Sequence, residues 1–578
     1  MKKRLFLVGA IALSLTSCAG VLTMQHSSVN YPIVRKGVDV VDLIGLESKG
    51  SDEADSAYLH SNLPFYLVKG GDETLYVSLE DYAAMLSFHI KGTYRNVFEK
   101  TGVNFAWTVA KGNTAEYQLI AQHVAERFSV AGSLSGAMDI YPDLSKSSLY
   151  SGASFYSGYL ARPYESHLHS SFTFLHYKSY IPYGGFFVPL SWWDTEVGLN
   201  SGIAHFYDGE RVYQYSDVSQ LTDVPFQGKT AAQRAMDYYL MHGMPSSLKN
   251  QIADSVYYLF QNYYGLPHDL GMYIGTFLTR NGIRAGIVSE DREKSNQYFE
   301  KIFGLLDDDH TGVLNVASWW GETVDAVWRG PNSKKRSSLA MELRAQRAAT
   351  FEAKKLSSDS IQYKDDMAMF GFDSFAFDYE AFDAEGKLKE DLWKTDSFFY
   401  FIRQLEAIKS HGGVKKVIID MSLNGGGVVG VMMKILALLS KNNDGTIHLR
   451  EHKNGGVTKM QAGVDSNLDG TFGIGDVYGN DFEFYIVTSD MSFSCGNALP
   501  YYAKKYGFAK IIGEKSGGGE CVVCSGFYPQ GVAYVMSSNN HIGYYDGKDF
   551  EGDEAGVQPD IGIPHSEFYD IEKIAAYL

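Results

Sequence analysis

The spacing of apolar residues divides the chain into regions that predict different secondary structure. From about residue 56 to 215, short alternating apolar runs are broken by Gly, Asp and Asn, which favours strands. Between 228 and 306, apolar residues recur three and four positions apart in "TAAQRAMDYYLMHG", "LKNQIADSVYYLFQNYYG" and "EKSNQYFEKIFGLL", a spacing typical of amphipathic helices. The charged run 333–356 predicts a further, solvated helix.

The last third of the chain alternates between the two patterns. Runs such as "KKVIIDM", "FEFYIVTS" and "AKIIGE" predict strands, and "FFYFIRQLEAIKSHG", "VGVMMKILALLSK" and "ALPYYAKKYG" predict helices between them. This alternation indicates a sheet covered by helices, so we expect a multidomain α/β protein. The expected boundaries are 1–18 for a signal peptide, 19–55 for a tether, 56–215 for a β-rich domain, 216–320 for a helical segment, 321–366 for a charged helical connector and 367–578 for an α/β domain.

Composition supports a folded protein and excludes one class of partner. Of the 578 residues, 45% are hydrophobic and 21% are charged, which is globular composition. The formal net charge is −17 and no basic face is evident, so we expect no nucleic-acid partner. Beyond the N-terminus, Cys495, Cys521 and Cys524 are too few for a disulfide framework. The CxxC pair is either a local disulfide or two unpaired thiols, and its context does not favour zinc.

The first 18 residues predict export. "MKKR" is basic, and "LFLVGAIALSL" is apolar but too short for a permanent membrane-spanning helix. "LTSC" follows, and this combination resembles the lipobox of bacterial lipoproteins, which implies that Cys18 becomes the lipidated N-terminus of the mature protein. The expected location is the bacterial cell envelope, lipid-anchored and facing outside the cytoplasm. The alternative is an ordinary cleaved signal peptide with a chance cysteine.

Two segments have the composition of a catalytic turn. "TSDMSFSCGNALP", residues 488–500, places hydroxyls and a thiol between a predicted strand and helix, so it is either a nucleophile or a helix cap. "VKKVIIDMSLNGGGVVG", residues 414–430, places three glycines between a strand and a helix. Glycines let backbone N–H groups approach a ligand, and a helix N-terminus favours negative charge, as an oxyanion hole requires. A structural turn would have the same sequence.

Four blocks, "IIDMSLNGGG", "SFSCGN", "IIGEKSGGG" and "GVQPDIGIP", occur in an order that resembles the C-terminal processing, or tail-specific, serine peptidase family. That family includes the tricorn core and the interphotoreceptor retinoid-binding repeats. The resemblance implies a ClpP/crotonase-like sheet with covering helices and hydrolysis of protein or peptide substrates through an acyl-enzyme. It makes Ser494 the nucleophile and Ser492 its support. The backbone N–H groups of Cys495 and of a glycine in the 425–427 run, Gly426 first, would form the oxyanion hole.

The general base separates two branches of this family. The processing branch uses a lysine, but here Lys515 stands out of register and Asn497 replaces that branch's glutamate. The tricorn-like branch uses a histidine instead. "FEKIFGLLDDDHTGV" resembles that branch's "Leu-x-Asp-x-His-Thr" step, which implies a Ser–His site with His310 as the base.

A third group should orient the imidazole. The tricorn-like branch supplies an acid shortly before the Gly-x-x-Pro-Asp block. There "FEGDEAGVQPD" offers Glu551, Asp553 and Glu554, of which we favour Glu554 and then Asp553.

Two other functions are consistent with the same residues. Retinoid-binding relatives keep this fold without peptidase activity, so the chain could be a catalytically inactive lipoprotein that binds a peptide or ligand. Alternatively, Cys495 attacks, because a thiol is intrinsically the better nucleophile. The sequence does not decide the substrate specificity or the oligomeric state.

The β-rich region contains a weak internal repeat. "DETLYVSLEDYAAMLSF" and "YGGFFVPLSWWDTEVGL" each read as a short strand, a Val-x-Leu step and a helix. This region resembles the N-terminal domain of copper amine oxidases, which implies a role in contact with a partner or with the rest of the chain.

One loop has calcium-ligand spacing. "DSNLDGTFGIGD", residues 465–476, resembles an EF-hand or dockerin-type loop. The resemblance implies a structural calcium ion bound by Asp465, Asn467, Asp469, Thr471 and Asp476. Asx-rich turns of this kind also close hairpins without metal. We expect no cofactor to be required for catalysis.

Overall fold

The computed structural model describes most of the chain, and the expected multidomain α/β class is confirmed. The signal peptide and Cys18 lie outside the described residues. No helix within the described ranges is both long enough and apolar enough to cross a membrane. The described residues are 33–48, 55–102, 104–122, 127–132, 134, 137–138, 154–159, 168–171, 186–267, 271–316, 330–378, 381, 388–452 and 455–578.

The first sheet begins earlier than the sequence analysis expected. Strand β1 lies between β2 and β12 in the order β10-β3-β2-β1-β12-β11. Residues 33–48 therefore form β1 and helix α2 rather than part of a tether, because Val38, Val40 and Val41 are buried in the core. The elements are β1 (Ile33–Asp42), α2 (Leu43–Ser48), β2 (Leu59–Val68), β3 (Tyr76–Ser78), β10 (Phe187–Pro189), β11 (Ala204–Tyr207) and β12 (Val212–Tyr215).

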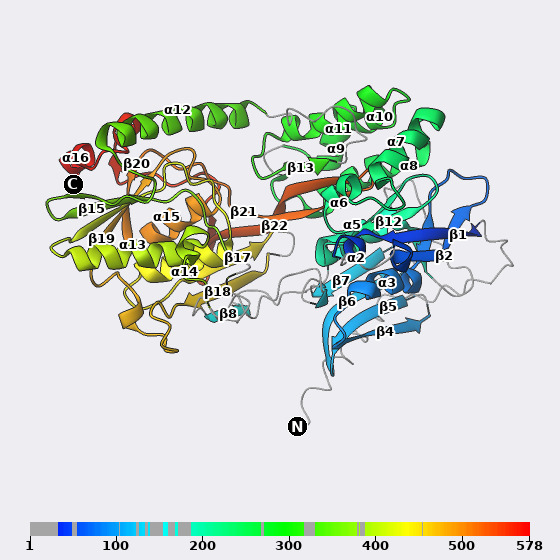
Figure 1. Ribbon diagram of the computed structural model, residues 1–578, viewed down its shortest axis with the longest axis horizontal. Coiled ribbons are helices and arrows are strands. Elements are labelled where there is room, and N and C mark those ends of the chain that lie inside the picture. The colour runs from blue at the N-terminus through cyan, green and yellow to red at the C-terminus, as the bar shows by residue number, and fades with distance from the viewer. Residues whose placement is uncertain are drawn as a thin grey trace.

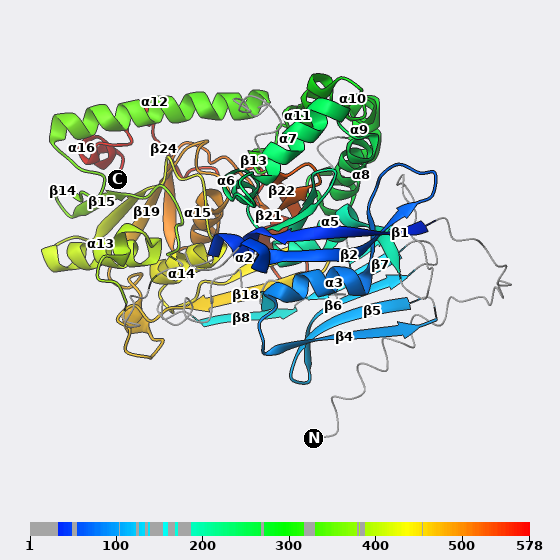
Figure 2. The same cartoon turned by 45° about the vertical axis from the view of Figure 1, so that its right-hand side comes forward.

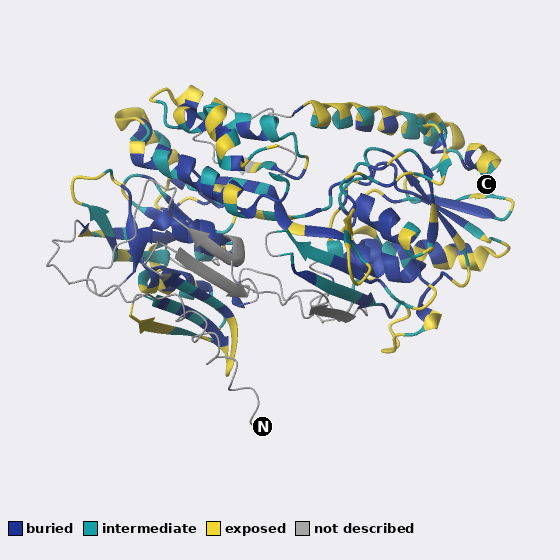
Figure 3. Ribbon diagram, turned by 180° about the vertical axis from the view of Figure 1, so that it is seen from behind, coloured by how far each residue is buried: buried dark blue, intermediate teal, exposed yellow. Residues whose placement is uncertain are grey.

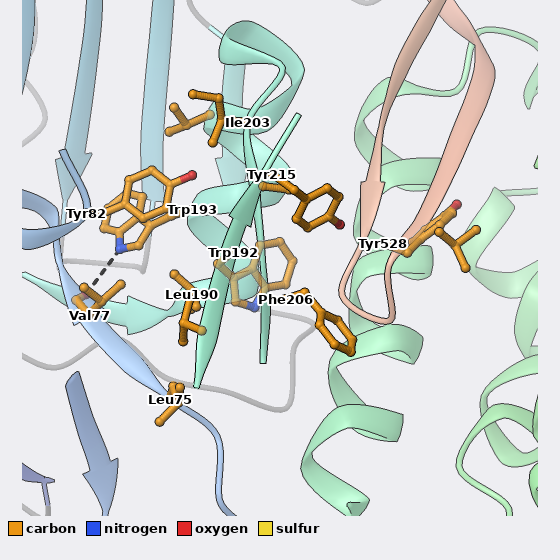
Figure 4. Close-up of a cluster of buried hydrophobic side chains, with 14 of the residues drawn as sticks. Leu75, Val77, Tyr82, Leu190, Trp192, Trp193, Ile203, Phe206, Tyr215 and Tyr528 are labelled. Carbon is orange, nitrogen blue, oxygen red and sulfur yellow. Dashed lines mark hydrogen bonds between the residues drawn. The ribbon is translucent and has the colours of Figure 1, made fainter. Parts of the chain in front are cut away.

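The two copies of the internal repeat have the same secondary structure. In each copy a short strand leads directly into a helix: β3 into α3 (Leu79–Leu86), and β10 into α5 (Leu190–Ser201). The two strands pair antiparallel, and Trp193 Nε1 donates a hydrogen bond to the carbonyl of Val77 across them (Figure 4). Helix α3 contacts both β3 and β5, so it lies between the first sheet and a second one (Figure 2). The second sheet contains β4 (Tyr94–Thr101), β5 (Asn104–Lys111), β6 (Thr114–Gln122), β7 (Arg127–Gly132) and β9 (Leu168–Ser171).

The predicted helical segment follows β12, a strand of the first sheet. Thr230 and Gln233 form a capping box at the start of α7, and the Asp291 side chain accepts a backbone N–H at the start of α11. The expected charged helix is α12 (Pro331–Lys354), whose outward face is exposed (Figure 3). The remaining elements are α6 (Val218–Asp223), α7 (Ala231–His242), α8 (Ser246–Tyr263), α9 (Ile274–Arg280), α10 (Ile283–Ile287), α11 (Arg292–Leu306) and β13 (Gly312–Val316).

The C-terminal α/β region has a central sheet in the order β14-β15-β16-β19-β20-β24. It is parallel from β15 to β24, and each of the inner strands is nearly all apolar, as expected for strands that are covered on both faces. The glycine loop follows β16, and the turn that contains Ser494 follows β19. The strands are β14 (Gln362–Lys364), β15 (Met367–Gly371), β16 (Lys416–Asp420), β19 (Glu483–Thr488), β20 (Ala509–Gly513) and β24 (Ile561–Gly562), and the helices are α13 (Ser397–His411), α14 (Val429–Leu439), α15 (Cys495–Lys505) and α16 (Ile571–Ile574).

A third sheet joins the two halves of the molecule. Its order is β13-β22-β17-β18-β8, with β21 and β23 also paired to β22 (Figure 1). The β21–β22 hairpin enters the N-terminal core, where Tyr528, Tyr534 and Met536 are buried with the residues of Figure 4. The strands are β8 (Ser154–Tyr159), β17 (Ile447–Glu451), β18 (Val457–Gly463), β21 (Cys521–Tyr528), β22 (Val532–Tyr545) and β23 (Phe550–Gly552).

The CxxC pair lies on β21 as two unpaired thiols. Residues three apart on a strand point to opposite faces of the sheet, so Cys521 and Cys524 are not placed to bond each other. Cys521 packs beside Gly265, where a Cβ would lie 2.8 Å from the Cys521 sulfur.

Candidate active site

Ser494 lies at a strained turn between β19 and α15. Its backbone has φ 58° and ψ −128°, a conformation that a non-glycine residue adopts only when its surroundings hold it. Its N–H donates to the carbonyl of Gly518 at 2.9 Å, and its carbonyl accepts from Asn497 and Ala498 at 2.8 Å. The side chain is partly exposed, and its hydroxyl has no hydrogen-bond partner among the described residues. The turn therefore holds the backbone of Ser494 and leaves Oγ available.

Ser492 supports this turn from the buried side. Its hydroxyl donates to the carbonyl of Met421 at 2.8 Å and accepts the N–H of Ser489 at 3.0 Å. Met421 follows β16, so this hydroxyl joins the ends of two neighbouring strands. The predicted supporting residue thus fixes the turn relative to the glycine loop.

The glycine loop lies directly against Ser494. A Cβ on Gly426, whose φ is +106°, would lie 2.7 Å from Ser494 Cβ and 3.1 Å from Oγ, so only glycine fits there. The Gly426 N–H already donates to Asn424 Oδ1 at 2.9 Å. The Cys495 N–H, at the N-terminus of α15, has no acceptor in the described part of the chain. Of the two predicted oxyanion donors, Cys495 is therefore available in this arrangement and Gly426 is occupied.

The Cys495 thiol is poorly suited to attack. It is buried and donates to the carbonyl of Gly427 at 3.2 Å. Burial, reinforced by the nearby Asp553, raises the pKa of the thiol to about 12. A thiolate, the reactive form, is therefore scarce at neutral pH. This favours Ser494 over the cysteine alternative.

His310 lies in the loop between α11 and β13. The Asp308 carboxylate accepts the His310 backbone N–H at 3.0 Å and the Thr311 hydroxyl at 2.6 Å. Thr311 Oγ1 in turn accepts the N–H of Ser537 on β22 at 3.0 Å, which fixes the loop to the third sheet. The imidazole lies against the ring of Phe493, with 4.6 Å between ring centroids. Phe493 directly precedes Ser494, so the His310 ring lies against the neighbour of the predicted nucleophile.

Burial keeps the imidazole in the form that a base requires. His310 is 8% exposed, and this burial lowers its pKa, against the opposing charges of Asp308 and Asp309 and with the help of Arg336. The net shift leaves the ring neutral at neutral pH, so it can accept a proton.

Arg336 of α12 connects several parts of this site. Its guanidinium lies 4.6 Å from the centroid of the Phe493 ring, donates to the carbonyl of Gly517 at 2.6 Å, and pairs with Asp309. The sequence analysis placed this residue on a solvated helix and gave it no role. No local pattern could have found it, because its partners come from three separate segments.

The two acids that the sequence favoured have different environments. Both carboxyl oxygens of Asp553 are buried with no hydrogen-bond partner among the described residues. Burial, together with Glu520 and Glu554, raises the pKa of Asp553 well above its ordinary value. Glu554 is partly exposed, and its carboxylate accepts the backbone N–H of Glu520 at 2.8 Å.

The lysine alternative finds no support in the arrangement. Lys515 is exposed. Asn497 is buried, accepts the Ser516 hydroxyl at 2.6 Å and donates to the carbonyl of Asp553 at 3.1 Å. Asn497 therefore holds the segments around the turn together.

A cavity of about 600 Å³ adjoins the site. It lies between α12, the loop that carries His310 and the residues that flank Ser494. Its lining includes Thr311, Met341, Gly425, Met491 and Phe493. Volumes of this order are typical of clefts that take a small ligand or a few residues of an extended peptide.

The predicted calcium loop is stabilised by its own hydrogen bonds. The carboxylate of Asp465 accepts the N–H groups of Asp469 and Gly470 at 3.1 and 2.7 Å. Similar bonds to backbone N–H groups engage the side chains of Asn467, Asp469 and Asp476, and Thr471 donates to Asp469. Among the described residues, no group of three or more His, Cys, Asp or Glu side chains is arranged to hold a metal ion. Asx turns of this kind form without metal, and calcium stays a prediction.

The position of His310 should depend on the Thr311 hydroxyl. We expect Thr311→Val to lower kcat/KM by about 10- to 100-fold, since a small displacement of a catalytic group has effects of that size. Leaving the buried Ser537 N–H without its acceptor should also cost about 1 to 3 kcal/mol of stability. Thr311→Ser keeps the hydroxyl and should stay near wild type. Peptide hydrolysis and thermal unfolding of the three proteins measure both effects. Equal losses in the two variants would contradict this role.

Comparisons with known proteins identify the C-terminal region. Residues 385–563 match the family model described as "Peptidase family S41". The matched region contains Ser494, Gly426 and Glu554, and it does not extend to His310. No curated protein matches the sequence.

Several solved structures share low similarity with the chain. A putative peptidase from Parabacteroides merdae is 14% identical, covers 55% of this chain and 90% of its own, and has a TM-score of 0.37. Mature CPAF complexed with lactacystin is 13% identical, with 57% and 98% covered and a TM-score of 0.37. The tricorn protease is 9% identical, with 94% and 58% covered and a TM-score of 0.32. Similarity at this level carries no further argument. Residues 385–563 thus match peptidase family S41, and this match supports a serine peptidase.

Proposed function

We propose that the protein is an exported, membrane-anchored serine endopeptidase of the tricorn-like, Ser–His branch. The observation that carries the proposal is the packing of the neutral His310 imidazole against Phe493, the residue before Ser494. The residues next to the proposed base and nucleophile, Thr311 and Phe493, line the same cavity. The substrate would be a protein or a peptide.

The proposed reaction has two steps. In the first step, Ser494 Oγ attacks the carbonyl carbon of the peptide bond and gives its proton to His310. The oxyanion is bound by the Cys495 N–H and, after release of the Asn424 side chain, by the Gly426 N–H. His310 then gives the proton to the leaving amine. In the second step, His310 takes a proton from water, the resulting hydroxide displaces Ser494 from the acyl group, and Oγ recovers its proton.

Carboxylates from two segments, the loop of His310 and the loop of Glu554, would stabilise the imidazolium that forms. Asp308 and Asp309 are the acids whose charge acts on His310 in the structure. Glu554 remains the proposed orienting acid ahead of Asp553, since burial raises the pKa of Asp553 and so disfavours its charged form.

The proposed location rests on the N-terminal sequence. "MKKR", the short apolar segment and "LTSC" support a lipid anchor at Cys18 in the bacterial cell envelope. The two strand-and-helix repeats pair through β3 and β10. This pairing is consistent with the interpretation that the β-rich region resembles the N-terminal domain of copper amine oxidases. That region would contact a partner or the rest of the chain.

One observation favours the second candidate function, a binding lipoprotein that has lost catalysis. The Gly426 N–H donates to Asn424, so one of the two predicted oxyanion donors is occupied. If this bond never opens, a ligand could bind in the cavity without being cleaved.

Labelling with a fluorophosphonate probe tests the proposal and separates it from both alternatives. We expect the wild type to be labelled, with the adduct on Ser494 in the digested protein by mass spectrometry. Cys495→Ala should still be labelled, because the substitution keeps the backbone N–H of residue 495. No labelling of the wild type favours the binding function, and labelling that disappears in Cys495→Ala favours the thiol.

A further inference from the structure

A buried acid–imidazole pair lies beside the site on the third sheet. Glu520 Oε1 lies 2.6 Å from His541 Nδ1, and their side chains are 12% and 10% exposed. The sequence analysis did not single out either residue. Burial raises the pKa of Glu520, but the hydrogen bond and charge of His541 and backbone N–H groups outweigh it, and the net pKa lies below the ordinary value. Glu520 is therefore ionised at neutral pH.

The other end of Glu520 holds the loop that carries the predicted acid. Its Oε2 accepts the Glu554 N–H at 3.1 Å, while the Glu554 carboxylate accepts the Glu520 N–H at 2.8 Å. These reciprocal bonds hold two segments together. A Cβ on Gly518 would lie 2.0 Å from the carbonyl of Glu554, and the Gly518 carbonyl accepts the Ser494 N–H. Glu520 is thus connected through short contacts to the nucleophile turn.

His541 extends the connection to the helical segment. Its Nε2 lies 3.0 Å from the carbonyl of Gly265, just after α8. Each ring nitrogen of His541 therefore faces an acceptor on a different segment, Glu520 or Gly265. The Gly265 N–H donates to the carbonyl of Ser537 at 2.9 Å. The Ser537 N–H in turn donates to the hydroxyl of Thr311, the neighbour of His310. Strand β22 therefore forms hydrogen bonds both to the segment after α8 and to the loop that carries His310.

We propose that Glu520 and His541 are positioning residues that hold the Ser494 turn and the Glu554 loop in register with the segment that carries His310. The inference rests on the proposed peptidase function. Glu520 is ionised and buried, so removing the imidazole beside it leaves its charge uncompensated, and the local structure must shift to rehydrate it. A shift here separates nucleophile, acid and base, which come from different segments.

Two substitutions test the pair, and the chain offers a matched control. In Glu520→Gln one carboxylate oxygen is replaced by an NH₂ group, which cannot accept a hydrogen bond. The side chain can then no longer accept from both His541 and Glu554. In His541→Gln a single amide nitrogen replaces the two ring nitrogens, so the side chain cannot donate to both Glu520 and Gly265. The control is His565→Gln, which removes a similar pair: His565 Nδ1 lies 2.9 Å from Glu514 Oε1, with side chains 30% and 38% exposed.

We expect Glu520→Gln and His541→Gln each to lower kcat for a peptide substrate by about 10- to 100-fold with KM changed much less. Fluorophosphonate labelling should slow in parallel, and His565→Gln should match wild type in both assays. The second readout does not depend on activity. In ¹⁵N-histidine NMR, Glu520→Gln should shift the Nδ1 resonance of His541, which faces Glu520 Oε1, and His565→Gln should leave that resonance in place.

The outcomes separate this inference from the function on which it rests. A wild type that neither labels nor cleaves overturns the proposed peptidase and, with it, the positioning role. A cleaving wild type whose two variants keep its kcat overturns the positioning role alone, whatever their thermal stability. A His541 Nδ1 resonance that Glu520→Gln leaves unchanged also overturns the positioning role.

Discussion

Replacing Ser494 by alanine is expected to abolish fluorophosphonate labelling and to lower kcat by about 10⁴-fold or more, as loss of a serine nucleophile does in other hydrolases. The fold should survive, because the Ser494 hydroxyl has no hydrogen-bond partner among the described residues while its backbone makes the bonds that hold the turn. Gel-based labelling and peptide hydrolysis measure the loss, and circular dichroism confirms the fold.

Ser494→Gly provides a matched control for the turn itself. Both variants remove the hydroxyl, but glycine also removes the Cβ from a backbone with φ 58°, where strain of about 1 to 3 kcal/mol is typical. That gain offsets the extra chain entropy of glycine, so Ser494→Gly should unfold at or above the temperature of Ser494→Ala. Labelling of either variant would show that another residue is the nucleophile.

Replacing His310 by glutamine is expected to lower kcat/KM by about 10²- to 10⁴-fold, the usual contribution of a general acid–base group. Glutamine has similar size and polarity but cannot take up a proton. The wild-type pH profile should show an acidic limb, because protonated imidazole cannot accept the Ser494 proton. Burial lowers the pKa of His310, so this limb should lie below 6.5, the ordinary value of a histidine.

The pH profile of His310→Gln is the control for that assignment. If His310 is the base, the variant should lose the limb as well as the rate. A wild-type limb above 6.5, or the same limb in both proteins, would place the titrating group elsewhere. Neither result would affect the Ser494 prediction, so the base and the nucleophile are tested separately.

The sequence predicted the parts of the site that depend on local backbone chemistry. A strand followed by consecutive glycines must turn closely past its neighbour, and Gly426 packs against Ser494 for that reason. The Asp308-x-His310-Thr311 spacing suits a turn in which a carboxylate accepts a backbone N–H two residues later, and Asp308 makes that bond. Short-range constraints of this kind depend only on residues close together in the sequence, so a local pattern predicts them.

Features that depend on distant segments could not be predicted in this way. Arg336 is one charge among many on a polar helix, and only the folded chain shows that it lies over Phe493. Asp553 and Glu554 are adjacent in sequence, yet Asp553 is buried and its pKa is raised, while Glu554 is partly exposed. The first strand was assigned to a tether because its partner β12 lies far along the chain.

The β21–β22 hairpin has a consequence for when the enzyme becomes active. A polypeptide is made from its N-terminus. The core around Trp192 and Trp193 is therefore incomplete until Tyr528 and Tyr534 have been synthesised. The loop of His310 waits likewise for Ser537. Contacts between such distant segments form late in folding. The order of synthesis therefore acts as a delay, and the growing chain has no working peptidase until almost all of it has been made.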